Sequence, residues 1–101
     1  VYMKRFGVEL LEGYGATEAS PLISVNVPGR NRHGSVGQFV PALEWRLEPV
    51  PGIEGGQKLF VRGPNVMRGY LDPTKPFGID LLPDGWHGTG DVVDVDQDGY
   101  I

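Results

Sequence analysis

Glycine and proline recur along the whole chain and limit the length of any regular element that it can form. Of the 101 residues, 16 are glycine and 9 are proline, and they are scattered between short apolar runs. Both residues disfavour helix interiors and favour tight turns. The sequence therefore predicts a single small domain of short strands joined by turns, and not a disordered segment.

Strand-like patterns occur in six short segments. Trp45 and Leu47 alternate with charged neighbours, and Leu59 and Val61 alternate with Lys58, Phe60 and Arg62, as in half-buried strands. The other candidates are Val8–Leu11, Leu22–Val27, Ser35–Val40 and Val92–Val95. Only Val1–Arg5 could be the tail of a helix. We expect a mainly β fold, either an antiparallel sheet or a small open barrel.

Charge and cysteine content exclude several classes of function. The formal net charge is −4 and no basic patch is visible, which argues against binding to nucleic acid or to an anionic lipid surface. The chain has no cysteine, so disulfides, thiolate metal sites and cysteine nucleophiles are excluded. No stretch resembles a signal peptide or a membrane-spanning helix. We therefore expect no nucleic acid partner and no membrane contact by these residues.

The first candidate binding segment is the glycine-rich loop Glu12-Gly13-Tyr14-Gly15-Ala16-Thr17-Glu18. Glycine permits close approach of the backbone to an anion, a threonine hydroxyl can donate to a phosphoryl oxygen, and a carboxylate can hold Mg²⁺. The Tyr14 ring could stack on a planar base. An ordinary turn with a packed tyrosine explains Gly13-Tyr14-Gly15 equally well, and Thr17 and Glu18 shift the balance towards phosphate binding.

A second glycine-rich segment, Gly85–Asp91, ends in Thr89-Gly90-Asp91. The Asp91 carboxylate could accept hydrogen bonds from both vicinal hydroxyls of a ribose, or it could simply cap a turn. His87 is interpreted as a surface or loop residue because no acidic partner is identifiable for it. Trp45 and Trp86 are interpreted as packing residues.

A rival motif lies close by, because Asp94, Asp96 and Asp98 followed by Gly99 reproduce the start of an EF-hand calcium loop. An EF-hand requires an incoming helix, whereas the preceding segment is rich in glycine and valine. A hairpin turn is the favoured interpretation, and a noncatalytic calcium-binding β module is kept as an alternative of another class.

Four motifs follow one another along the chain: Glu12–Glu18, Gly34–Gly37, Leu59–Leu71, and Gly85-Trp86 with Thr89-Gly90-Asp91. With these residues nearly the whole chain resembles the adenylate-forming superfamily, which includes acyl-CoA synthetases, luciferases and adenylation domains of nonribosomal peptide synthesis. The resemblance implies that residues 1–20 end the large α/β subdomain and carry the nucleotide loop. It implies that residues 21–101 form the small, distorted antiparallel β-barrel subdomain.

The resemblance also implies ATP and Mg²⁺ as cofactors and a role for each site residue. Tyr14 would stack near adenine, Thr17 would contact the α-phosphate or adenylate, Glu18 would help to hold Mg²⁺, and Asp91 would bind the ribose hydroxyls. The small residues Gly13, Gly15 and Ala16 would shape the edge of the adenine and acyl-carbonyl site. Thr17 and Glu18 are the expected catalytic residues.

Two short stretches, Ser24–Pro28 and Val50–Glu54, look most like the bifunctional acyl-acyl-carrier-protein synthetases and 2-acylglycerophosphoethanolamine acyltransferases of Gram-negative bacteria. That resemblance implies fatty acid, acyl carrier protein and a lysophospholipid as partners, on the cytoplasmic side of the inner membrane. Long-chain acyl-CoA synthetase, with coenzyme A as acceptor, is the alternative within the same chemistry. The chain is expected to be a fragment that is inactive alone, because the family's phosphate loop, ribose-binding Arg and C-terminal Lys have no counterpart in it.

Overall fold

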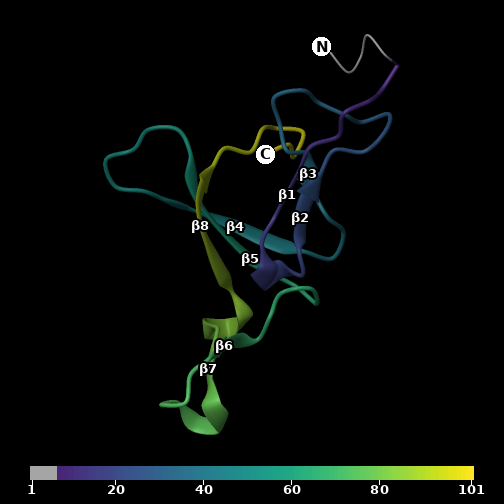
Figure 1. Ribbon diagram of the computed structural model, residues 1–101. Coiled ribbons are helices and arrows are strands. Elements are labelled where there is room, and N and C mark those ends of the chain that lie inside the picture. The colour runs from purple at the N-terminus through teal and green to yellow at the C-terminus, as the bar shows by residue number, and fades with distance from the viewer. Residues whose placement is uncertain (1–6) are drawn as a thin grey trace.

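In the computed structural model, which describes residues 7–101, two three-stranded antiparallel sheets and one separate hairpin account for all the strands (Figure 1). The first sheet has the order β1-β2-β3, with β1 at Gly13–Gly15, β2 at Leu22–Val25 and β3 at Gln38–Phe39. The second has the order β4-β5-β8, with β4 at Glu44–Pro49, β5 at Gln57–Arg62 and β8 at His87–Val93. The hairpin pairs β6 (Gly69–Leu71) with β7 (Ile79–Leu81).

Helical structure in the described residues is limited to three short 3₁₀ turns. They are η1 (Thr17–Ala19), η2 (Pro76–Gly78) and η3 (Pro83–Gly85). The prediction of a mainly β, antiparallel fold is therefore confirmed. The helix tail expected at Val1–Arg5 lies outside the described residues. None of the helical segments in residues 7–101 is long and apolar enough to cross a membrane.

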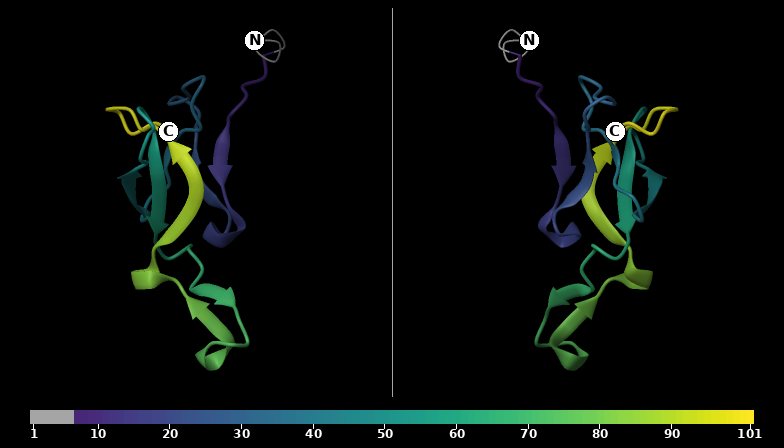
Figure 2. Two further views of the ribbon diagram at one scale, coloured as in Figure 1. Left: turned by 90° about the vertical axis from the view of Figure 1, so that its left-hand side faces the viewer. Right: turned by 90° about the vertical axis from the view of Figure 1, so that its right-hand side faces the viewer.

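The expected barrel is not closed. No ladder joins the two three-stranded sheets in residues 7–101, where the only backbone pairing from β3 towards the other sheet is an isolated bridge between Gln38 and Tyr100. The physical reason is the brevity of β3, whose two residues cannot support a continuous ladder. Figure 2 shows the two sheets facing one another, with the β6–β7 hairpin projecting beyond one end of them.

A small apolar core holds the two sheets together. It consists of five buried side chains contributed by η1, by β2, by the approach to β4 and by β5: Ala19, Ile23, Leu43, Leu59 and Val61. Each fully buried aliphatic side chain contributes roughly 1.5–3 kcal/mol. Because η1 connects β1 and β2 of the first sheet while β5 belongs to the second, this core fixes the first glycine-rich loop against the second sheet.

The strand expected at Val8–Leu11 is absent. These residues belong to no strand of the structure, and Val8 and Leu10 are 47% and 56% exposed. The strand of the loop starts later, at Gly13, where pairing with Val25 of β2 begins. The predicted boundary between residues 20 and 21 falls in the turn between these two paired strands, and the division into subdomains stays a prediction.

Candidate functional site

The first glycine-rich loop forms a tight turn in which the backbones of β1 and β2 nearly touch. A Cβ atom on Gly15 would lie 1.9 Å from the carbonyl oxygen of Pro21, so no other residue fits that position without a backbone shift. The Ala16 amide donates to that oxygen at 2.6 Å, and the Ala19 amide donates to the Ala16 carbonyl at 2.9 Å. Glycine is thus required by close backbone approach, and the turn presents Thr17 and Glu18 at its outer edge.

A segment that comes almost fifty residues later clamps this turn. The Asn65 side-chain amide donates to the Ala19 carbonyl at 2.8 Å and to the Leu22 carbonyl at 3.2 Å. The Met67 amide donates to the Glu18 carbonyl at 2.8 Å. These bonds satisfy carbonyls that the short η1 turn leaves without helical partners. Asn65 therefore supports the loop from outside the nucleotide motif.

The second glycine-rich segment is the first part of β8 and contains a bulge. Phe60 pairs with Gly88 and Lys58 pairs with Val92, so that Leu59 alone faces the three residues Thr89, Gly90 and Asp91. The Thr89 hydroxyl donates to the Leu59 carbonyl at 3.0 Å and accepts the Asp91 amide at 3.2 Å. Bulges redirect side chains that a regular ladder would fix. Here the bulge turns Asp91 towards β1.

Tyr14 and Asp91 are brought into direct contact by these two backbone features. The Tyr14 hydroxyl donates a hydrogen bond to Oδ2 of Asp91, although 77 residues separate them in sequence. Burial, followed by this bond to the carboxylate, raises the pKa of Tyr14 to about 12, so that the phenol is protonated at neutral pH. A carboxylate has about four acceptor sites. Asp91 therefore keeps acceptor sites beyond the one that Tyr14 uses.

A second contact joins the same two segments. The Glu18 carboxylate accepts a hydrogen bond from the Tyr70 hydroxyl at 3.2 Å, and its Oε2 lies 3.7 Å from Nε2 of His87. Tyr14 of the first loop thus faces Asp91 of β8, and Glu18 faces His87. The two segments therefore run antiparallel where they meet. Loss of solvent around the hydroxyl, followed by its bond to the Glu18 carboxylate, raises the pKa of Tyr70.

His87 is not the surface or loop residue that the sequence suggested. It starts β8, is 4% exposed, and its Nε2 has no hydrogen-bond partner in the described part of the chain. Leaving a buried polar group unpaired costs roughly 1–3 kcal/mol. Since the nearest carboxylate is that of Glu18, the acidic partner that the sequence could not identify is supplied by the first loop.

Thr17 and Glu18 stand where the resemblance expects a phosphate ligand and a magnesium ligand. Thr17 is exposed at the start of η1. No group of three potential metal-binding side chains occurs within residues 7–101. Mg²⁺ in nucleotide sites is commonly held by one or two carboxylates together with substrate phosphates and water. The single carboxylate of Glu18 therefore fits a magnesium ion carried by ATP, and would not hold one without phosphates.

Trp86 packs as predicted, and it does so between two arginines. The guanidinium carbons of Arg46 and Arg62 lie 4.6 and 4.5 Å from its ring centroid. Trp45 stacks on Phe39 at a centroid distance of 4.6 Å. A pocket of about 370 Å³ lies beside Trp86 and is also lined by Tyr70 and His87. The sandwich around Trp86 fixes the start of β8 and with it the position of His87.

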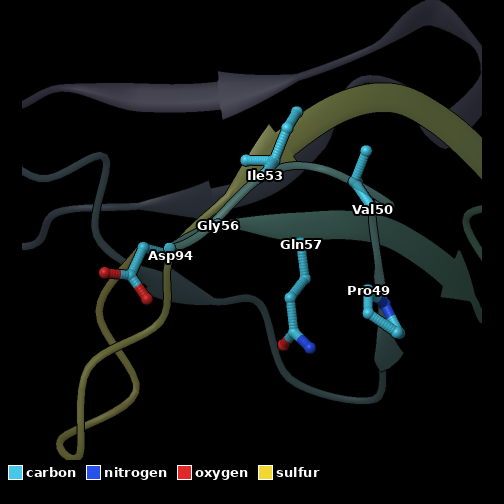
Figure 3. Close-up of a pocket in the computed structure, with 7 residues that line it drawn as sticks. Pro49, Val50, Ile53, Gly56, Gln57 and Asp94 are labelled. Carbon is cyan, nitrogen blue, oxygen red and sulfur yellow. The ribbon is translucent and has the colours of Figure 1, made fainter.

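A further pocket, of about 320 Å³, lies at the loop between β4 and β5 (Figure 3). Gln57 and Pro49 point to the opposite side of this loop from Ile53 and Val50 in that view, and Asp94 stands at the end of the pocket. None of the predicted site residues lines it. It has no place in the site described above.

The aspartate-rich segment forms a turn, as the favoured interpretation held. The Asp96 amide donates to the Tyr100 carbonyl at 2.9 Å, and the Gly99 amide donates to the Asp96 carbonyl at 3.0 Å. Two of its carboxylates are engaged by Arg32, which pairs with Asp96 and, at 3.0 Å, with Asp98. Backbone donors, first that of Tyr100, lower the pKa of Asp96. A guanidinium occupies the place that a calcium ion would need.

Of the predicted site residues, the structure joins Tyr14 to Asp91 and places Thr17 and Glu18 on the adjoining turn. Gly13 and Gly15 build β1, and Ala16 closes the turn. Sequence reasoning missed three residues that contact this site, namely Asn65, Tyr70 and His87. Asn65 and Tyr70 belong to the Leu59–Leu71 motif, whose position in the family pattern was the available signal.

Comparison with known proteins identifies a family for this chain. A family model described as "AMP-binding enzyme" matches residues 1–71. A long-chain-fatty-acid–CoA ligase of Salmonella typhimurium is 43% identical over 108 aligned positions, which cover 99% of this chain and 18% of the ligase. The chain thus spans about a fifth of the length of the curated relatives that it matches.

Two solved structures share the fold. The anthranilate CoA ligase AuaEII in complex with anthranoyl-AMP has a TM-score of 0.77 and 28% identity, over 98% of this chain and 20% of that one. The O-succinylbenzoate coenzyme A synthetase of Bacillus subtilis, in complex with ATP and magnesium ion, has a TM-score of 0.68 and 27% identity, over 89% of this chain and 25% of that one.

Proposed function

The chain belongs to the AMP-binding enzyme family, and from that membership we propose that it is part of an ATP-dependent ligase that joins a fatty acid to a thiol. The observation that carries the proposal is the double contact between the first loop and β8, Tyr14 with Asp91 and Glu18 with His87. These contacts bring together an aromatic ring suited to a base, a carboxylate that can accept from ribose hydroxyls, and a carboxylate suited to a magnesium ion on the phosphates. The fatty acid as substrate is supported by the relative from Salmonella typhimurium.

In the proposed reaction, a carboxylate oxygen of the fatty acid attacks the α-phosphorus of ATP and forms the acyl-phosphate bond. The bond between the α-phosphorus and the oxygen that bridges to the β-phosphate breaks, and pyrophosphate leaves. A thiolate then attacks the acyl carbonyl carbon and AMP leaves. The first step depends on positioning and on neutralising charge at phosphorus.

Each site residue contributes binding or orientation. Asp91 accepts hydrogen bonds from the ribose hydroxyls while Tyr14 donates to its other oxygen and offers its ring to adenine. Thr17 donates to an oxygen of the α-phosphate. Glu18 would hold a magnesium ion, whose charge offsets that of the phosphates when it is bound. Gly13, Gly15 and Ala16 shape the edge of the adenine and acyl-carbonyl site.

For the thiol acceptor we propose acyl carrier protein, within a bifunctional protein that also reacylates 2-acylglycerophosphoethanolamine. Its support is the resemblance of Ser24–Pro28 and Val50–Glu54 to that class. Inside the first stretch, Ser24 is buried and donates to the Val36 carbonyl at 2.8 Å, while Asn26 donates to the Ser35 carbonyl at 2.9 Å. These residues fold the following loop. Ser24 and Asn26 therefore have a structural role, and the stretch supports the assignment only because it resembles that class of proteins.

Coenzyme A is the second candidate acceptor, and the names of the relatives favour it. A lysophospholipid substrate would place the intact protein on the cytoplasmic side of the bacterial inner membrane, and we propose that location on this ground alone. The 101 residues themselves are proposed to make no membrane contact.

The acceptor is decided by one experiment on the intact protein that carries these residues. Labelled long-chain fatty acid and Mg-ATP are supplied with acyl carrier protein or with coenzyme A, and Asp91→Ala is the control. Acylated carrier protein that is lost in the variant supports the proposal. Formation of acyl-CoA alone would identify coenzyme A as the acceptor and would leave the ligase assignment unchanged. Product in neither reaction, from a folded protein, refutes the ligase.

A further inference from the structure

Both protein contacts of the Glu18 carboxylate are made by one of its two oxygens. The Tyr70 hydroxyl donates to Oε2 at 3.2 Å, and Nε2 of His87 lies 3.7 Å from the same Oε2. Within residues 7–101 no hydrogen bond reaches Oε1. A carboxylate held at one oxygen keeps the other free for a further ligand, and its orientation is fixed by the two groups that hold it.

The two holding groups come from different parts of the fold and are themselves constrained. His87 is 4% exposed and begins β8 beside the arginine-sandwiched Trp86. Its buried Nε2 has no hydrogen-bond partner in the described residues, and the Glu18 carboxylate lies within ion-pairing range at 3.7 Å. Tyr70 lies in β6, and its ring is half exposed. Glu18 itself sits on a turn whose carbonyl is tied down by the Met67 amide at 2.8 Å.

We propose that Tyr70 and His87 are positioning residues that hold Oε2 of Glu18 and leave Oε1 available to a magnesium ion carried by ATP. This inference rests on the proposed function and deepens it. Residues that orient a metal-binding carboxylate typically change metal affinity by 10- to 100-fold when they are lost. Neither residue touches a reacting atom, and both act through Glu18.

Two variants separate this role from general support of the fold. Tyr70→Phe removes only a hydroxyl from an exposed side chain, so that folding is preserved. His87→Leu removes the buried nitrogen while it keeps an apolar side chain of similar size, and His87→Gln restores an amide nitrogen at a similar position. His33→Leu and Tyr100→Phe are matched controls, since His33 is exposed and Tyr100 donates its hydroxyl to the Arg30 carbonyl, away from Glu18.

The measurement is calorimetric binding of two nucleotides to the intact protein: ATP with Mg²⁺, and AMP in EDTA. We expect His87→Leu to weaken binding of Mg-ATP roughly 10-fold and Tyr70→Phe to weaken it by a smaller factor, with AMP affinity unchanged in both. His87→Gln recovers most of the loss, and the two control variants bind as wild type.

Other outcomes overturn the inference in distinguishable ways. Wild-type affinity for Mg-ATP in both Tyr70→Phe and His87→Leu refutes the positioning role alone. Equal weakening of Mg-ATP and AMP in both shows a general structural effect and also refutes it. A wild-type protein that binds neither nucleotide removes the proposed function and the inference together.

Discussion

Tyr14 donates its phenolic hydrogen to the carboxylate of Asp91, and this bond connects the edge strand of one sheet to the edge strand of the other. The two residues come from the two glycine-rich segments and are 77 positions apart in sequence. No ladder joins the sheets in the part of the chain that the structure describes. The side-chain bond between Tyr14 and Asp91 therefore links two sheets that no backbone ladder joins within residues 7–101.

Loss of the Asp91 carboxylate should weaken nucleotide binding. Asp91→Ala removes the acceptor of both ribose hydroxyls, and hydrogen bonds to a charged group are each worth roughly 1.5–3 kcal/mol. Because two such bonds are lost, we expect affinity of the intact protein for AMP to fall roughly 100-fold or more in calorimetric titration. Asp94→Ala, at an exposed neighbouring carboxylate, is the matched control. Equal affinities for wild type and Asp91→Ala would rule out the ribose contact.

Tyr14 should ionise later than an ordinary tyrosine. Its pKa is raised from 10.0 to about 12, chiefly by burial and then by the bond to Asp91. Because the folded-state pKa is raised, the stabilisation is fully present below pH 10 and is lost as the pH rises through about 12. Tyrosinate absorbance, taken as the difference between wild type and Tyr14→Phe, measures this step. Asp91→Asn should lower the pKa of Tyr14. Ionisation of Tyr14 at the ordinary tyrosine pKa in wild type would contradict the bond to Asp91.

Gly15 should tolerate no side chain. An alanine Cβ would lie 1.9 Å from the Pro21 carbonyl oxygen, whereas at Gly13 the nearest atom is the Ser24 carbonyl oxygen at 3.3 Å. We expect Gly15→Ala to destabilise by about 3 kcal/mol and Gly13→Ala by about 1 kcal/mol. Chemical denaturation of the intact protein compares the two variants. Similar stabilities for both would show that the turn relaxes easily.

Calcium should not bind to the aspartate-rich turn while Arg32 occupies it. The guanidinium pairs with Asp96 and Asp98 and lies 4.0 Å from the centroid of the Tyr100 ring. Calorimetric titration with Ca²⁺ should give no saturable heat for wild type, and Arg32→Ala serves to show whether the freed carboxylates can bind the ion. Saturable binding by wild type that Asp96→Ala abolishes would revive the calcium-module alternative.

The strands that sequence alone predicted well are those with a period-two pattern and a buried face. Leu59 and Val61 alternate with Lys58, Phe60 and Arg62 and are both nearly fully buried in β5. The three-residue strands β6 and β7 were missed because Gly69-Tyr70-Leu71 and Ile79-Asp80-Leu81 are too short to show any period. The strand predicted at Val8–Leu11 was wrong for a different reason. An apolar run forms a strand only where a neighbouring strand pairs with it.

The second segment shows where local patterns stop being informative. Glycines at 85, 88 and 90 predict a loop, yet β8 begins at His87 because β5 supplies a ladder and the bulge at Thr89–Asp91 absorbs the extra residues. The burial of His87 and its approach to Glu18 depend on that tertiary pairing. The identities of Tyr14, Thr17, Glu18 and Asp91 as candidates came from motifs, whereas the residues that hold them came only from the structure.

The central claim is that these residues belong to a protein that activates a long-chain fatty acid as its adenylate. Exchange of labelled pyrophosphate into ATP by the intact protein tests that step without any thiol acceptor. The account predicts exchange that requires both the fatty acid and Mg²⁺ and that falls sharply in Asp91→Ala. Exchange that proceeds without a fatty acid, or that is unaffected by Asp91→Ala, would contradict it, as would its absence from a folded wild-type protein.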